Sequence, residues 1–192
     1  MGSDQRKVDD DSMVHRRDFL VITAGGLVSG VLLFSCSGSG SDSPWRFFTR
    51  SEGLLVEAAA DQLIPPDQDP GGRWADVARF IDRQLISYYR PLQERYRYGL
   101  ASLEASSLRI KGFSFVDLPG DDQKQVLEAI EGDAVPEGIW KHESASSFFN
   151  LFLDHCMQGF YGTPRHGGNR NYVSYRMIGL DYPQILGRVK NA

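Results

Sequence analysis

Cysteine is almost missing from this sequence, and its scarcity excludes several kinds of site. The 192 residues include two cysteines, Cys36 and Cys156. Zinc sites built from CxxC pairs and haem attachment through a CxxCH motif are therefore excluded. If Cys36 has another use, no intramolecular disulfide forms, and the fold is stabilised by packing alone.

Clustered histidines and basic blocks are also absent. The four histidines lie far apart, without the HExxH spacing that places two metal ligands on one helical face. The formal net charge is -4, and no Lys/Arg block follows the N-terminal segment. We therefore expect no metal site, no nucleic-acid partner and no polybasic membrane-binding patch.

No hydrophobic run is long enough to cross a bilayer as an ordinary helix. The run at residues 19–34 has 16 residues, where about 20 are needed, and it contains three glycines. Its length, position and preceding charge are typical of the hydrophobic region of a signal peptide. The preceding RRDFL resembles the twin-arginine motif. We predict that residues 1–35 are a twin-arginine signal peptide, recognised by the translocon through Arg16, Arg17, Phe19 and Leu20.

The end of this segment, Leu33-Phe34-Ser35-Cys36, resembles a bacterial lipobox. Lipidation of Cys36 after cleavage would hold the protein on a membrane through its acyl chains. Ordinary cleavage near Ser35 and an uncleaved anchor are the alternatives. The Gly/Ser-rich residues 36–48 favour lipidation, because a lipoprotein needs a flexible tether between the anchor and the folded body at residues 49–192.

The export route poses a question that the mature sequence leaves open. Twin-arginine export carries folded proteins, and the usual reason is a cofactor inserted, or a partner assembled, in the cytoplasm. No cofactor motif is present in the mature chain, so we expect no cofactor in this chain. A partner assembled before export is the remaining reason. The expected location is the periplasm, with the protein anchored to the membrane.

The remaining sequence is typical of an all-α domain of about five to six helices with long Gly/Pro-rich connections. Strand-like alternation of apolar and polar residues is nearly absent. Thr49 and Glu52 form a capping box before the first helical pattern, which Pro65-Pro66 terminates. The later helices are expected at about residues 75–89, 92–108, from Gly120 or Asp121, and 144–160. On the second helix, we expect Val77, Phe80, Ile81, Leu85 and Tyr88 to form the buried face.

The C-terminal segment, GFYGTPRHGGNRNYVSYRMIGLDYPQ, combines many glycines with four tyrosines. Glycines at this density predict tight turns or close backbone approach, and tyrosines offer amphipathic contact area. Such a segment lines a site or lies against another protein. We predict that it binds a partner through Tyr161, Gly162, Pro164, His166, Gly167, Gly168 and Asn169.

Several of these stretches together resemble a known family, subunit 3 of gluconate 2-dehydrogenase. They are the arginine-pair signal, a helix ending in LIPPD, WADVARFIDRQL, GFSFVDLPGDDQKQVL and GFYGTPRHGGN. The resemblance covers most of residues 50–180. Its most specific part is the Tyr-Gly-x-Pro-x-x-Gly-Gly-Asn run at residues 161–169.

The resemblance implies a non-catalytic small subunit of a membrane-bound, flavin-dependent sugar or sugar-acid dehydrogenase. In that family the large partner holds FAD, and a haem-bearing cytochrome c subunit often relays electrons. The small subunit binds the large one in the cytoplasm and supplies the signal that exports both. The partner would then be the folded cargo.

Two other functions remain open at this stage. One is a stand-alone periplasmic enzyme, for example a hydrolase using His166 and an acidic residue, and the other is a lipoprotein binding module. Cys156 follows His155 directly, and adjacent helical side chains point about 100° apart, so they do not form a nucleophile–base pair. With the non-catalytic role that the resemblance implies, we expect no catalytic residue in this chain.

Overall fold

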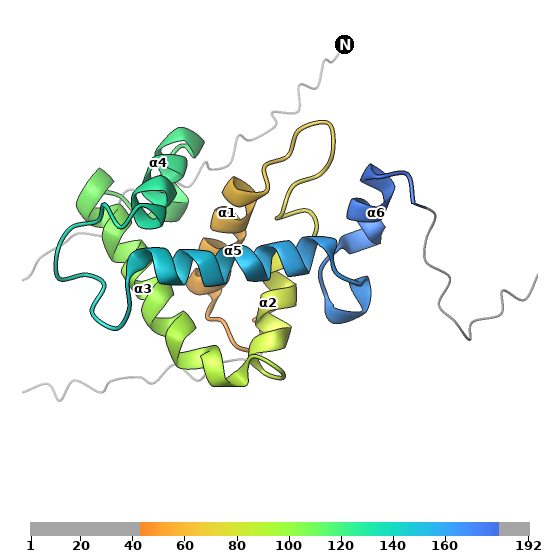
Figure 1. Ribbon diagram of the computed structural model, residues 1–192, viewed down its shortest axis with the longest axis horizontal. Helices are drawn as coiled ribbons and strands as arrows, with labels where there is room; N and C mark the ends of the chain where they lie inside the picture. Colours follow the sequence, from red (N-terminus) through yellow and green to blue (C-terminus); the bar gives the residue numbers. More distant parts are fainter. Residues whose placement is uncertain (1–42, 181–192) are drawn as a thin grey trace, which may run out of the picture. The chain divides into compact units, whose positions relative to one another are not determined.

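The computed structural model describes residues 43–180, which contain six α-helices and short 3₁₀ turns and no β-strand (Figure 1). The predicted all-α fold is confirmed. The predicted signal peptide, with Arg16, Arg17, Phe19 and Leu20, and the predicted lipidation site, Cys36, lie outside the described residues and stay predictions. Across residues 43–180, no helix is long and apolar enough to span a membrane.

The helices follow the predicted order along the chain. The α-helices are α1 (Arg50–Leu63), α2 (Val77–Leu85), α3 (Gln93–Lys111), α4 (Gly120–Glu131), α5 (Ala145–Tyr161) and α6 (Val173–Met177). The 3₁₀ helices are η1 (Arg90–Leu92), η2 (Phe115–Asp117), η3 (Pro164–His166) and η4 (Arg170–Tyr172).

Local capping sets the start of two helices. The Thr49 hydroxyl accepts a hydrogen bond from the Glu52 N–H at 3.2 Å, and the Glu52 carboxylate accepts the Thr49 N–H at 2.8 Å. Ser144 caps α5 in the same position, accepting the N–H of Ser147 at 3.2 Å. These bonds satisfy backbone donors that the first turn of a helix leaves unpaired, so the predicted capping box is confirmed.

The second helix is shorter than residues 75–89, and one of its predicted core residues is wrong. Asp76 precedes α2 in the left-handed conformation, with φ 59°, so the helix begins only at Val77. After Leu85 the chain makes a wider turn, in which the Tyr89 N–H donates to the Gln84 carbonyl at 2.7 Å. This turn brings Tyr89 into the core and leaves Tyr88 82% exposed.

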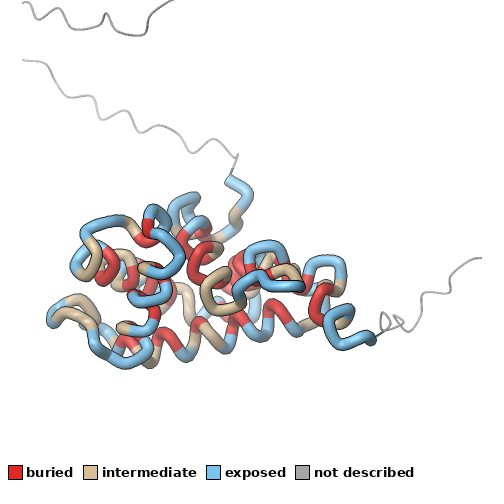
Figure 2. The backbone as a smooth tube through the Cα atoms, turned by 90° about the horizontal axis from the view of Figure 1, so that it is seen from above, coloured by how far each residue is buried: buried red, intermediate tan, exposed pale blue. Residues whose placement is uncertain are grey.

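Helix α5 lies at the centre of the domain and packs against the other five α-helices (Figure 1). Its buried face is dominated by aromatic rings, and Figure 2 shows buried positions alternating with exposed ones along the helical segments. Gly99 of α3 permits a close approach to α5, because a Cβ there would overlap the Phe148 ring. The buried apolar residues of α5 are Ala145, Phe148, Phe149, Phe152, Cys156 and Phe160.

A buried carboxylate on α2 holds the segment that precedes α1. Asp82 is 1% exposed, and its Oδ2 accepts the Arg46 N–H at 2.8 Å. Its Oδ1 accepts the N–H groups of Phe47 and Phe48 at 2.9 and 3.0 Å. Arg97 supports the same segment by donating to the Phe47 carbonyl at 2.7 Å. The predicted tether therefore joins the domain at a fixed point; we call this the Asp82 clamp.

A buried histidine of α5, His155, stacks against aromatic rings of the neighbouring segments. His155 is 4% exposed, its ring stacks on Tyr89 at 4.0 Å, and its Nδ1 lies 2.7 Å from the Tyr96 hydroxyl. Burial is the main reason that the pKa of His155 is lowered to about 4; Asp154 opposes this shift in part, and Arg95 adds to it. The ring is therefore neutral at pH 7 and shares a hydrogen bond with the Tyr96 hydroxyl.

We expect this histidine to make the fold acid-sensitive. Because the pKa of His155 in the folded protein lies below its ordinary value of 6.5, the unfolded chain binds the proton more tightly. The free energy of unfolding should fall as the pH drops from about 6.5 to about 4, with a slope from this group of up to about 1.4 kcal/mol per pH unit. Denaturant titrations across this range measure the slope.

The matched variant is His155→Gln, which keeps a hydrogen-bond acceptor near Tyr96 but does not titrate in this range. It should lower the stability at pH 7 and flatten the pH dependence between pH 6.5 and 4. An identical pH slope in both proteins would contradict the assignment of this slope to His155.

Candidate partner-binding site

The Tyr-Gly-x-Pro-x-x-Gly-Gly-Asn run leaves the end of α5 and folds back against it. Gly162 ends the helix, and its N–H donates to the Gln158 carbonyl at 2.9 Å. Gly167 has φ 119°, a conformation that side-chain-bearing residues rarely adopt. Gly168 lies so close to α5 that a Cβ would overlap the carbonyl oxygen of Gly159. The last two glycines of the run are therefore required by the turn itself.

Asn169 closes this turn by bridging its two ends. The residue is fully buried and adopts the left-handed conformation, with φ 47°. Its Nδ2 donates to the Gly162 carbonyl at 2.7 Å, and its Oδ1 accepts the Ser174 N–H at 3.0 Å. Asparagine tolerates this backbone conformation better than most residues, and its amide pairs with both a donor and an acceptor. We therefore assign Asn169 a structural role.

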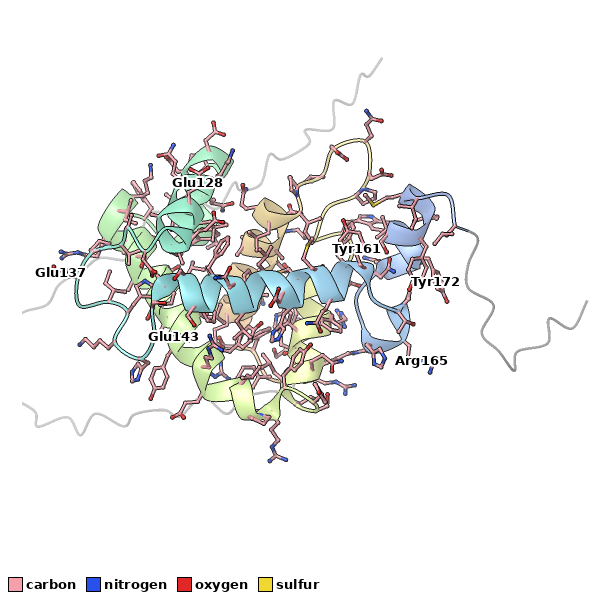
Figure 3. The ribbon with its side chains drawn as sticks, viewed as in Figure 1. Glu128, Glu137, Glu143, Tyr161, Arg165 and Tyr172 are labelled. Atoms are coloured by element: carbon pink, nitrogen blue, oxygen red, sulfur yellow. The ribbon has the colours of Figure 1, made fainter. Side chains whose placement is uncertain are left out.

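The structure divides the predicted site residues into an internal group and an external one. Gly168 and Asn169 are buried, whereas Tyr161 and His166 are exposed at the surface. Figure 3 labels Tyr161, Arg165 and Tyr172, which all lie toward the C-terminal end of α5. Gly162, Pro164 and Gly167 are of intermediate exposure and connect the two groups.

The segment after Asn169 is held in an unusual backbone conformation. Asn171 and Tyr172 have φ 51° and 56°, and a tyrosine in the left-handed region is uncommon. The Arg170 N–H donates to the Ala75 carbonyl at 3.2 Å, which ties this segment to the start of α2. The Arg170 guanidinium lies 5.7 Å from the centre of the Trp74 ring. Two distant parts of the chain thus form one surface.

Arg176 of α6 lines two hollows on this surface. One hollow, of about 470 Å³, is also lined by Pro164, Asn171 and Tyr172. The other, of about 400 Å³, is lined by Trp74 and Val173 together with Asp69 and Pro70. We call Trp74 and residues 161–180 the tail surface. Sequence reasoning missed Trp74, Arg170 and Arg176 as members of it.

A second surface feature lies elsewhere, between α1, α3 and η2. It is an apolar groove of about 300 Å³ whose walls include Leu54, Leu55, Leu100 and Val116. Glu52 and Glu104 lie at its rim, but Glu52 is paired with Arg97, and Glu104 accepts the Phe115 N–H at 3.2 Å. We call it the α1/α3 groove.

Two adjacent titratable side chains of α5, His155 and Cys156, are buried near the tail surface. Burial raises the pKa of the Cys156 thiol far above its usual range, which keeps it protonated and unreactive. His155 is occupied with Tyr96 and Tyr89, and His166 is exposed on η3. Within residues 43–180, no group of histidine, cysteine and carboxylate residues is arranged to hold a metal ion.

Comparison with known proteins gives one match, and it spans the helices described above. The family model described as gluconate 2-dehydrogenase subunit 3 matches residues 50–181. The chain belongs to this family. No curated protein and no solved structure matches the chain.

The subunit 3 match begins at the first residue of α1 and includes the whole tail surface. The resemblance found in the sequence is therefore confirmed at the level of the family. Because the family name describes one subunit of a dehydrogenase complex, the tail surface and the α1/α3 groove are interpreted as candidate contacts for other subunits.

Proposed function

We propose that this gluconate 2-dehydrogenase subunit 3 protein is a non-catalytic small subunit that binds, co-exports and anchors a large flavoprotein subunit. The large subunit would hold FAD and oxidise a sugar or sugar acid, and a cytochrome c subunit would receive the electrons. The observation that carries the proposal is the family match over residues 50–181.

The arrangement of the Tyr-Gly-x-Pro-x-x-Gly-Gly-Asn run supports a binding role. Gly167, Gly168 and Asn169 fix a turn, and that turn presents exposed side chains such as Arg165 rather than a cluster of reactive groups. A surface built on a fixed turn suits recognition, since little conformational freedom is lost when a partner binds.

The N-terminal residues supply the export and anchoring parts of the proposal. Arg16 and Arg17 would direct the assembled pair to the twin-arginine translocon, and a lipid on Cys36 would hold the pair at the periplasmic side of the membrane. The Asp82 clamp supports this arrangement, because it attaches the end of the predicted tether to the folded domain at residues 46–48.

Co-purification tests the binding and anchoring parts. When the two subunits are co-expressed, the large subunit should be captured with the small one and should fractionate with the membrane. Cys36→Ser should leave the pair intact but release it into the soluble fraction. Failure of the wild-type chain to capture the large subunit would reject the proposal, and a membrane-bound Cys36→Ser pair would reject the lipid anchor.

The alternative of a stand-alone periplasmic lipoprotein enzyme predicts different behaviour. It requires activity of the purified chain alone and loss of that activity in His166→Ala. His166 is exposed, and its hydrogen bonds in the structure are made by its backbone, whose N–H donates to Thr163 at 3.2 Å. A lipoprotein binding module without a dehydrogenase partner would purify alone under the same co-expression.

A further inference from the structure

We propose that the tail surface docks an acidic surface of the large subunit, with Arg176 as the central contact. This inference rests on the proposed function and adds to it the place and the chemistry of the contact. The proposed partner is a protein surface that carries carboxylate side chains beside apolar ones.

Charge is divided unevenly along the domain. Residues 164–180 contain three arginines and no acidic residue, whereas residues 43–163 contain 12 Lys/Arg and 18 Asp/Glu, a net charge of -6. Figure 3 shows the same division in space, with Arg165 at one end of α5 and Glu137 and Glu143 at the other. An acidic partner is therefore attracted to the tail surface and repelled by much of the rest of the domain.

The arginines of the tail surface are available to a partner. Among the described residues, no carboxylate lies within ion-pair distance of Arg165 or Arg176, and both are exposed. Arg170 has only a 3.9 Å contact with Asp76 and is 54% exposed. A guanidinium presents paired donors that match a carboxylate, so each of these arginines suits an ion pair across an interface.

Apolar side chains flank these cations. Trp74 is 39% exposed and Met177 is 40% exposed, and the exposure of Ile178 and Leu180 is higher still, at 66% and 57%. Arginine, tryptophan and methionine beside apolar area are the composition that protein interfaces favour. The two hollows on either side of Arg176 are large enough to receive individual side chains. These features favour a protein partner over an anionic lipid surface.

The backbone beneath the surface is fixed before binding. Asn169 bridges the two ends of the turn, and the Arg170 N–H ties it to the start of α2. The arginines and Trp74 are therefore presented from a preorganised scaffold, which lowers the entropic cost of association.

The test is equilibrium binding of the purified large subunit to the immobilised full-length chain. Arg176→Glu should raise the dissociation constant at least about tenfold, because it reverses a central charge. Lys141→Glu makes the same two-unit charge change on an exposed loop residue outside the tail surface and should alter the constant less than about threefold. The wild-type constant should also rise with ionic strength. Melting temperatures of both variants should match the wild type, because both residues are exposed.

Each other outcome overturns the inference in a distinct way. If the wild-type chain does not bind the large subunit, the proposed function fails and this inference fails with it. Unchanged affinity in Arg176→Glu and Arg165→Glu overturns the inference alone. If Leu54→Glu abolishes binding in that case, the large subunit binds at the α1/α3 groove instead. If Arg176→Glu instead loses only binding to phosphatidylglycerol vesicles, the tail surface contacts the membrane.

Discussion

Replacing Gly168 with alanine is expected to lower the free energy of unfolding by about 3 kcal/mol, or roughly 10 °C in Tm. The added Cβ would overlap the carbonyl oxygen of Gly159, and a backbone atom cannot rotate away as a side chain does. The turn must therefore separate from α5, which also strains the Asn169 bridge to Gly162. Thermal melting followed by circular dichroism measures the loss.

Gly120→Ala is the matched control for this substitution. A Cβ there would meet only Gln62 Nε2 at 3.4 Å, an ordinary contact with the end of a flexible side chain. Because Gly120 is the first residue of α4 and has no positive φ, alanine should leave Tm unchanged or raise it slightly. Equal melting temperatures for Gly168→Ala and Gly120→Ala would refute the close packing of the turn on α5.

Removing the carboxylate of Asp82 is the second change with a large expected effect. In Asp82→Ala, the N–H groups of residues 46–48 lose their acceptor, at a site where Asp82 and Phe48 are buried. The free energy of unfolding should fall by about 3 kcal/mol, since an unpaired buried donor costs about 1–3 kcal/mol and the segment recovers part of this cost by detaching. Chemical denaturation measures the loss.

Detachment of the segment has a second, local readout. Trypsin cleavage after Arg46 should become at least about tenfold faster in Asp82→Ala under native conditions, because the Asp82 clamp no longer protects that bond. Asp154→Ala changes an exposed aspartate on α5 and should leave both stability and cleavage close to wild type. Wild-type cleavage rates in Asp82→Ala would show that the clamp does not hold the segment.

The parts of the fold predicted from sequence are those set by neighbouring residues. The capping box of Thr49 and Glu52 depends on residues three positions apart, so it is visible in the sequence. The limits of α2 depend on distant contacts instead. Asp76 adopts its left-handed conformation where the Arg170 N–H donates to the adjacent Ala75 carbonyl. The spacing of apolar residues does not reveal this hydrogen bond.

The same distinction applies to the candidate site. The density of glycine in residues 159–168 identified a tight turn, which the structure contains. That Gly168 faces Gly159 and that Asn169 bridges to Ser174 depend on how the turn returns to α5, which spacing does not reveal. The contribution of Trp74 was missed for the same reason. The lack of acidic residues at positions 164–180 is a signal in the sequence by which the arginines could have been found.

The Asp82 clamp is a third feature beyond the reach of sequence patterns. An aspartate within an amphipathic helix is ordinarily a solvent-facing residue, and nothing next to Asp82 marks it as buried. Its partners are three consecutive backbone N–H groups, which every sequence has and which therefore leave no motif. Such carboxylates are recognised only when the fold is known.

The most direct test of the proposed function is the location of the large flavoprotein subunit when both chains are co-expressed. With the wild-type chain, the flavoprotein should reach the periplasmic side of the membrane. With Arg16→Lys/Arg17→Lys, it should stay in the cytoplasm, folded and still bound to the small subunit. The control Arg46→Lys/Arg50→Lys changes a second arginine pair outside the signal and should export normally. Unchanged export of the flavoprotein with Arg16→Lys/Arg17→Lys would contradict the account.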